Sequence, residues 1–158
     1  MAEQENAPQP KFALQRIYLK DLSFESPNAP ATFQQEWKPQ VNMDLNTENK
    51  QLNENQWEVI LTLTINAKVD EKSAFLVEVQ QAGVFLIEGL SPPQLAQTLG
   101  AFCPNLLFPY ARETIDAMVV KGSFPALMLQ PVNFDAIFAE TARRKQAAAS
   151  EAAEAAKH

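Results

Sequence analysis

The sequence predicts a mixed α+β fold, in which a half made of strands is followed by a half made of helices. Residues 37–46 and 57–69 alternate apolar and polar side chains, which is the period of a half-buried strand. After residue 104 the apolar positions recur every three or four residues, as on a helix with one apolar face. The chain has 158 residues, of which 46% are hydrophobic, so it can bury one core of ordinary size but not two.

Residues 12–24 form the first candidate strand. Its apolar phase changes between Leu14 and Ile17, and apolar side chains occur on both faces, which indicates a β-bulge at this point. The segment SPNAPATFQQE that follows (26–36) carries two prolines and is predicted to be a loop.

The second candidate strand, residues 37–46, alternates almost perfectly between apolar and polar side chains. Because proline has no N–H to donate to a strand ladder, Pro39 indicates that this strand begins there or lies at a sheet edge. The residues on its apolar face are Trp37, Val41, Met43 and Leu45.

The next two candidate strands, residues 57–69 and 74–87, are separated only by the short polar stretch 70–73. Two strands joined by so short a turn pair in an antiparallel hairpin. Asp70 and Glu71 lie in this turn and are predicted to be solvated charges.

A long helix is predicted from Pro104 to its C-terminal cap at Gly122, with Pro109 tolerated only in the first turn. Its apolar surface is too wide to be covered by one sheet face, so part of it is expected to meet another subunit. The apolar positions are Leu106, Leu107, Tyr110, Ala111, Ile115, Ala117, Met118 and Val119.

A second helix is predicted to begin after Asn133, a good N-cap, with Asp135 in the first turn where the helix dipole favours an acid. Its inward or ligand-facing stripe is Phe134, Ile137, Phe138 and Ala142. We expect a domain at residues 12–145, a flexible tail at 1–11, and a mobile tail at 146–158, where no large apolar side chain occurs.

Few side chains are available for catalysis or for metal binding. The only imidazole is His158, the last residue, and the only thiol is Cys103, which is expected to be a small buried side chain. Four His or Cys ligands for zinc do not exist, and no glycine-rich phosphate-binding motif occurs. The sequence therefore predicts neither an enzyme nor a metal or cofactor site.

The formal net charge of −6 makes a general attraction to nucleic acid or to an anionic membrane unfavourable. The polar N-terminus lacks the pattern of a signal peptide, and no apolar run reaches the length of a membrane helix. With a single cysteine, these features favour the cytoplasm. By elimination, the excess of apolar side chains indicates oligomerisation, an apolar binding groove, or both. The simpler alternative, in which all of them are core, stays open.

Four sequence blocks, in the same order, resemble the SecB family of bacterial export chaperones over about residues 12–142. The blocks are RIYLKDLSFESPNAP (16–30), FLVEVQQAGVF (75–85), LGAFCPNLLFPYARETI (99–115) and FPALMLQPVNFDAIF (124–138). The resemblance implies a four-stranded antiparallel sheet packed against two helices, assembled as a tetramer that is a dimer of dimers. It also implies a chaperone that holds unfolded precursor proteins without ATP and delivers them to the SecA motor.

The resemblance further implies roles for particular residues. The residues that would contact SecA are Asp21, Glu25, Leu76 and Glu78. Those that would lie between subunits are Val77, Val79 and Gln81, with Leu107, Tyr110, Ala111 and Ile115 of the long helix. The groove for unfolded clients would be lined by Val41, Met43, Leu45, Phe138 and Ala142.

Two departures from the family pattern matter for these roles. Thr141 and Ala142 replace larger side chains, so the groove is expected to be shallower or shifted toward Phe134 and Ile137. The tail is also not acidic, which leaves a second contact with SecA in doubt. The alternatives are a SecB-like chaperone of a toxin–antitoxin system, a carrier of a small apolar ligand, and an enzyme that uses acids near the turns.

Overall fold

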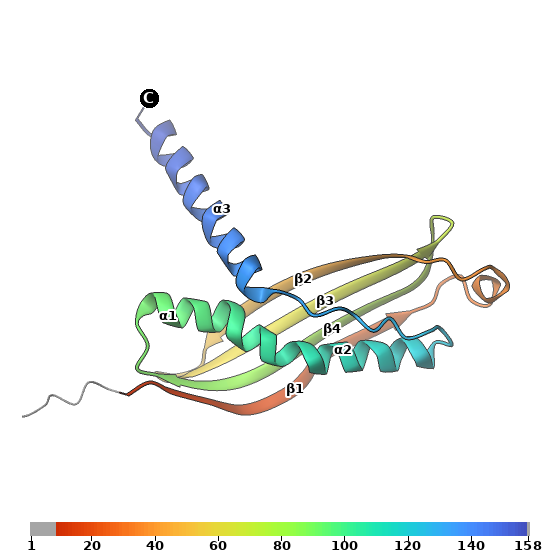
Figure 1. The fold of residues 1–158 in the computed structure, drawn as a ribbon, viewed down its shortest axis with the longest axis horizontal. Helices are drawn as coiled ribbons and strands as arrows, with labels where there is room; N and C mark the ends of the chain where they lie inside the picture. Colours follow the sequence, from red (N-terminus) through yellow and green to blue (C-terminus); the bar gives the residue numbers. More distant parts are fainter. Residues whose placement is uncertain (1–8, 158) are drawn as a thin grey trace, which may run out of the picture.

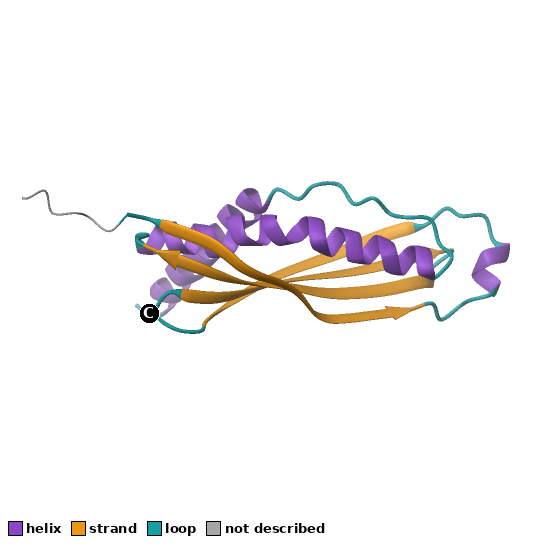
Figure 2. Ribbon diagram, turned by 90° about the horizontal axis from the view of Figure 1, so that it is seen from below, coloured by secondary structure: helices purple, strands orange, loops and turns teal. Residues whose placement is uncertain are grey.

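The computed structural model describes residues 9–157, which form one antiparallel sheet of four strands with helices on one face (Figures 1 and 2). The strand order is β1-β4-β3-β2, so β1 and β2 are the two edges. The strands are β1 (Lys11–Glu25), β2 (Gln40–Gln51), β3 (Gln56–Val69) and β4 (Lys72–Glu88). Residues 1–8 of the predicted N-terminal tail, and His158, lie outside the described residues.

Strand β1 carries the predicted bulge, since its pairing with β4 shifts between Leu14 and Arg16. A second shift, between Leu19 and Asp21, was not predicted, although the apolar positions change phase again there, from Ile17 and Leu19 to Leu22 and Phe24. The loop that follows β1 contains a short 3₁₀ helix, η1 (Ala31–Gln34).

Strand β2 begins directly after Pro39 and lies at an edge, so both structural interpretations of this proline are confirmed. Trp37 precedes the strand, and its ring lies 5.4 Å from that of Phe124 between centroids.

Strands β3 and β4 form the predicted antiparallel hairpin, with Val69 paired to Lys72. Asp70 and Glu71 make the two-residue turn, with φ angles of 49° and 66°. Left-handed backbone at both turn positions matches the right-handed twist of the strands. Both side chains are exposed, as expected for solvated charges.

The helical run begins earlier than predicted, because α1 (Pro92–Gln97) and the π-helical segment η2 (Thr98–Phe102) precede α2 (Cys103–Lys121). Ser91 begins the run with a capping box, in which its side chain accepts a hydrogen bond from the backbone N–H of Gln94. Pro109 consequently lies inside α2 rather than in a first turn. An interior proline removes one N–H bond and crowds the preceding turn, yet α2 continues through Pro109 to Lys121.

Helix α2 covers β3 and β4 and closes the core. Gly122 caps it, as predicted. Cys103 is fully buried, and burial raises the pKa of its thiol to about 12, so the thiolate needed for nucleophilic chemistry is strongly disfavoured.

The segment after α2 runs back along that helix toward the start of α3 (Figure 1). Asp116 of α2 holds it there, since Oδ1 accepts hydrogen bonds from the backbone N–H of Leu127 at 3.0 Å and of Met128 at 3.3 Å. This return path places α3 beside η2.

Helix α3 (Phe134–Ala155) begins at the predicted N-cap, where Asn133 Oδ1 accepts a hydrogen bond from the N–H of Ala136 at 3.0 Å. Its first turns contact η2, and the remainder projects away from the sheet (Figure 1). Residues 146–155 are helical and exposed. Their mobility stays a prediction.

Candidate functional site

A line of apolar side chains runs along the edge strand β2, and we call Val41, Met43 and Leu45 the β2 strip. Their pairing partners on β3 are Ala67, Ile65 and Leu63, all fully buried in the core. Directly paired residues share a sheet face, so the strip lies on the face that carries the helices. Helix α2 packs mainly over β3 and β4, and Met43 on β2 is 39% exposed.

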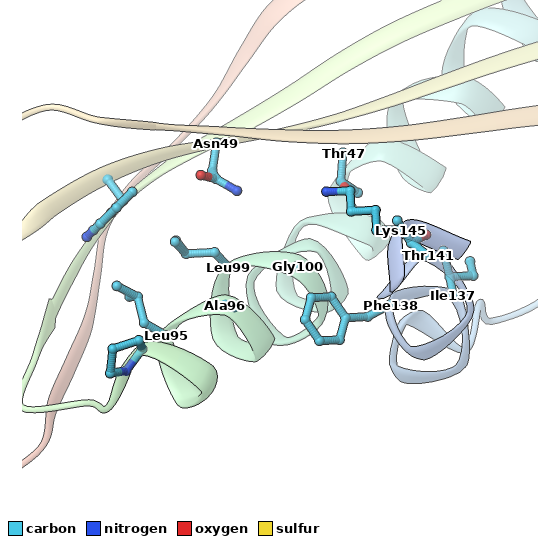
Figure 3. A pocket seen from close by; sticks show the side chains of 12 residues that line it. Thr47, Asn49, Leu95, Ala96, Leu99, Gly100, Ile137, Phe138, Thr141 and Lys145 are labelled. Carbon is cyan, nitrogen blue, oxygen red and sulfur yellow. The ribbon is translucent and has the colours of Figure 1, made fainter. Parts of the chain in front are cut away.

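At one end of the strip is a hollow of about 450 Å³ between β2, α1, η2 and α3 (Figure 3). We call it the Phe138 hollow. Phe138 and Ile137 enter it from α3, while Thr47 and Asn49 continue the line of the β2 strip into it. The other lining residues are Trp57, Pro92, Leu95, Ala96, Leu99, Gly100, Thr141 and Lys145.

At the opposite end of the strip, aromatic rings from four separate segments meet. The ring centroid of Phe124 lies 5.3 Å from that of Phe33, 5.4 Å from Trp37 and 5.1 Å from Phe75. A second hollow of about 150 Å³, which we call the Trp37 hollow, is lined by Phe33, Trp37 and Phe124. The sequence prediction missed this cluster except for Trp37, because residues so far apart along the chain show no common period.

The predicted groove residues are only partly brought together. The β2 strip lies between the two hollows, and Ile137 and Phe138 line one of them. Phe134 is instead a core residue, 3% exposed, whose ring packs edge-on against Phe108 at 6.0 Å between centroids. Ala142 is exposed on α3 but lines neither hollow.

The four residues assigned to SecA contact lie together on the helix-free face of the sheet. Glu25 of β1 pairs with Leu76 of β4, Glu78 lies two residues further along β4, and Asp21 pairs with Gln80. Thr64 donates a hydrogen bond to the carboxylate of Glu78 at 3.0 Å. Among the described residues none of the three carboxylates forms an ion pair, so this acidic face can accept a basic partner.

A second charged group on the helix-free face was not predicted from the sequence. The hydroxyl of Tyr18 and the ammonium of Lys20 both donate hydrogen bonds to Glu58, the latter at 3.0 Å. Burial, the hydrogen bond and the negative charge of Glu58 raise the pKa of Tyr18 to about 12. The hydrogen bond from Tyr18, assisted by Lys20 and opposed by burial, lowers the pKa of Glu58.

Most of the residues predicted to lie between subunits are buried within the single chain. The fully buried ones are Val77, Val79, Leu107, Ala111 and Ile115. Gln81 is also buried, and its Nε2 donates a hydrogen bond to the carbonyl oxygen of Tyr18 at 3.1 Å. These side chains have little surface to offer a second subunit in the single chain, and their place between subunits stays a prediction. Tyr110 differs from them, because 47% of it is exposed.

None of the helices in residues 9–157 is long and apolar enough to cross a membrane. The same residues contain no group of three or more His, Cys, Asp or Glu placed to hold a metal ion. What they do contain is an apolar line with a hollow at each end. The fold and this site define a small α+β binding protein.

Comparison with known proteins places this binding protein in a family. The family model described as preprotein translocase subunit SecB matches residues 5–145. The protein-export protein SecB of Hahella chejuensis is 76% identical, with 100% of both chains covered. That of Marinobacter nauticus is 64% identical, covering 99% of this chain and 96% of its own. The chain belongs to the SecB family of protein-export chaperones.

A solved structure shares the fold. The SecB-like chaperone of Mycobacterium tuberculosis, in complex with a ChAD peptide from an antitoxin, superposes with a TM-score of 0.64 over 77% of this chain and 89% of that one. The two sequences are 12% identical, so the likeness shows the fold alone and does not favour a toxin–antitoxin role.

Proposed function

We propose that this SecB-family chain is an ATP-independent holdase of the cytoplasm that binds unfolded precursor proteins along the β2 strip. The observation that carries the proposal is the continuity of the strip with a hollow at each end. From Trp37 to Asn49, at about 3.3 Å per residue, the line is about 40 Å long. An extended client segment of about a dozen residues would lie along it.

Apolar burial suits this task, because it is not directional and therefore accepts many client sequences. Burying one large client side chain contributes about 1.5 to 3 kcal/mol. Micromolar binding needs a net binding free energy of about 8 kcal/mol. This must remain after the free-energy cost of lost translational and rotational freedom, about 4 to 15 kcal/mol, has been overcome. Several side chains must therefore be held at once, which two hollows and a strip between them permit.

The exposed side chain of Met43 lies in the middle of the strip. Its unbranched thioether adapts to client side chains of different shapes. A client that folds quickly buries its own apolar side chains and is not held, so the selection of clients is kinetic.

The test of this function is to add charge to the strip and to one hollow together, by Met43→Asp with Phe138→Asp. A carboxylate in an apolar site must be desolvated when a client binds, so we expect suppression of aggregation without ATP to fall at least tenfold in potency. The matched control is Asn42→Asp, because Asn42 neighbours Met43 but pairs with Asn66 on the other sheet face. Unchanged suppression by the double variant would contradict the proposal.

We further propose that the protein assembles as a homotetramer and delivers clients to SecA through the acidic face. The exposed apolar side chains of α2 support assembly, since Tyr110 is 47% and Val120 57% exposed. The edge strand β1 adds an unpaired strand edge with Leu14 and Leu19 exposed. A tetramer would present several strips to one client, which raises the effective concentration of each.

A further inference from the structure

The segment between α2 and α3, residues 122–133, contains no helix or strand. Figure 1 shows it running back between α2 and β2, and Figure 2 shows it on the same side of the sheet as the helices. At one end of the segment, Ser123, Phe124 and Pro125 line the Trp37 hollow. The other end leads into α3, which carries Phe138. The segment therefore joins the two hollows and forms a wall beside the β2 strip.

One carboxylate accepts every hydrogen bond that the middle of this segment makes. Among the described residues, the only hydrogen bonds of residues 125–132 are those that the N–H groups of Leu127 and Met128 donate to Oδ1 of Asp116. Asp116 forms no ion pair with any other residue in the range 9–157. A hydrogen bond to a charged acceptor is stronger than one between neutral groups, so Asp116 is the main polar anchor of the segment.

The anchor acts on a residue whose backbone is unfavourable. Met128 has a φ of 50°, in the left-handed region that costs free energy for any residue with a Cβ. Leu127 and Leu129 on either side pack against the core, whereas Met128 is 73% exposed. Loss of the acceptor at Asp116 would favour a return of Met128 to an ordinary φ, which would shift the residues on both sides of it.

We propose that Asp116 is a positioning residue for client binding, which fixes residues 122–133 as the wall beside the β2 strip and keeps Phe124 in place at the Trp37 hollow. This inference rests on the proposed holdase function and adds to it a residue that itself lines neither hollow. Client affinity falls in proportion to the fraction of the protein in which the binding-competent wall is formed.

The experiment compares Asp116→Ala with Asp116→Asn in the full chain. Alanine removes the acceptor, whereas asparagine loses the charge but keeps a carbonyl oxygen that can accept the same bonds. Hydrogen exchange of the amides of Leu127 and Met128 should become about tenfold faster in Asp116→Ala, because their acceptor is lost. Affinity for a labelled peptide with alternating Leu and Phe, measured by fluorescence anisotropy, should fall about five- to tenfold. Asp116→Asn should stay within about twofold of wild type in both measurements.

The two tryptophans of the chain report on the two hollows separately, since Trp37 lines one and Trp57 the other. In a Trp57→Phe background, Asp116→Ala should shift the emission of Trp37 to longer wavelength, because the ring of Phe124, 5.4 Å away between centroids, is less firmly held. In a Trp37→Phe background, the emission of Trp57 should stay unchanged. A general loss of packing would shift both emissions and would overturn the inference.

The matched control is Glu113→Ala, which removes an exposed carboxylate from α2 one turn before Asp116. It should leave amide exchange, emission and peptide affinity unchanged. Equal peptide affinity in Asp116→Ala and wild type, or an equal loss of affinity in Asp116→Asn or Glu113→Ala, would also overturn the inference. Failure of the proposed function is distinguishable from this, because the wild-type protein itself would then not bind the peptide.

Discussion

The backbone of Gly100 lies directly against the ring of Phe138. A methyl group built on Gly100 would stand 2.7 Å from Cε2 of that ring and closer still to Cδ2, which is nearer than carbon atoms approach without displacement. Gly100 belongs to the π-helical segment η2, and Phe138 to α3. The missing side chain of Gly100 is therefore what allows Phe138 to lie in its hollow.

Gly100→Ala should displace Phe138 and weaken client binding by about tenfold, with a loss in free energy of unfolding of about 1 to 3 kcal/mol from overpacking. In a Phe138→Ala background the added methyl group has space, so the same substitution should be neutral or slightly stabilising, since alanine favours helix over glycine. Urea unfolding and client affinity of the four proteins form a double-mutant cycle. Additive effects would show that Gly100 does not act through Phe138.

The acidic face predicts a separable defect in transfer to SecA. Glu78→Lys reverses one charge between Asp21 and Glu25 and should weaken SecA binding by at least tenfold, because like charges at an interface oppose association. Client binding should be unchanged, since Glu78 faces away from the β2 strip. Glu48→Lys is the control, because it pairs with Ile60 on the same sheet face but on the edge strand β2. Equal loss of client and SecA binding would mean that Glu78 acts through the fold.

Assembly should depend on the exposed side of α2. Tyr110→Asp with Val120→Asp puts charge on two side chains that are about half exposed in the single chain. If another subunit covers them, the charges must be desolvated and the tetramer should dissociate. Light scattering measures the mass directly, and Asn46→Asp on β2 serves as the control. A double variant that keeps the wild-type mass would exclude this side of α2 as the interface.

The Tyr18 and Glu58 pair predicts how stability changes with pH. The pKa of Tyr18 is raised from 10.0 to about 12, so its contribution is complete below about pH 10 and is lost as pH rises through about 12. The pKa of Glu58 is lowered, so its contribution is present above the ordinary carboxyl pKa and is lost as pH falls through the folded value.

Tyr18→Phe should therefore be less stable than wild type near neutral pH, and the difference should shrink toward pH 12. Cys103 also has a raised pKa, but both proteins contain it, so the comparison isolates Tyr18. The measurement is the free energy of unfolding in urea at several pH values. A difference that stays constant between about pH 9 and 12 would argue against the hydrogen bond to Glu58.

Several elements could be read from local sequence, because the signal lies within a few residues. Alternation along Trp57 to Val69 predicted a strand with one buried face, and Pro39 predicted where its neighbour begins. The cap at Asn133 was predicted from a side chain that bonds to a backbone group three residues away. The β1 bulge followed from the change of apolar phase after Leu14.

The start of the helical run was missed because its signal was misread. Pro104 has the sequence pattern of a helix N-terminus. The helical run instead begins after Ser91, which forms a capping box with Gln94. The partnership of Gly100 with Phe138, and of Tyr18 with Glu58, joins residues about forty positions apart, a separation at which no period in the sequence relates them.

Local periodicity alone determined the strands, the hairpin and the cap of the last helix, and the four blocks of resemblance indicated the SecB family. Only the tertiary structure decided which apolar residues are core and which are available to a partner. Val77 and Met43 both look like buried strand residues in the sequence, yet α2 covers β4 and leaves the edge strand β2 open. The physical reason is that burial depends on which element lies above a side chain, and the path of the chain between elements decides this.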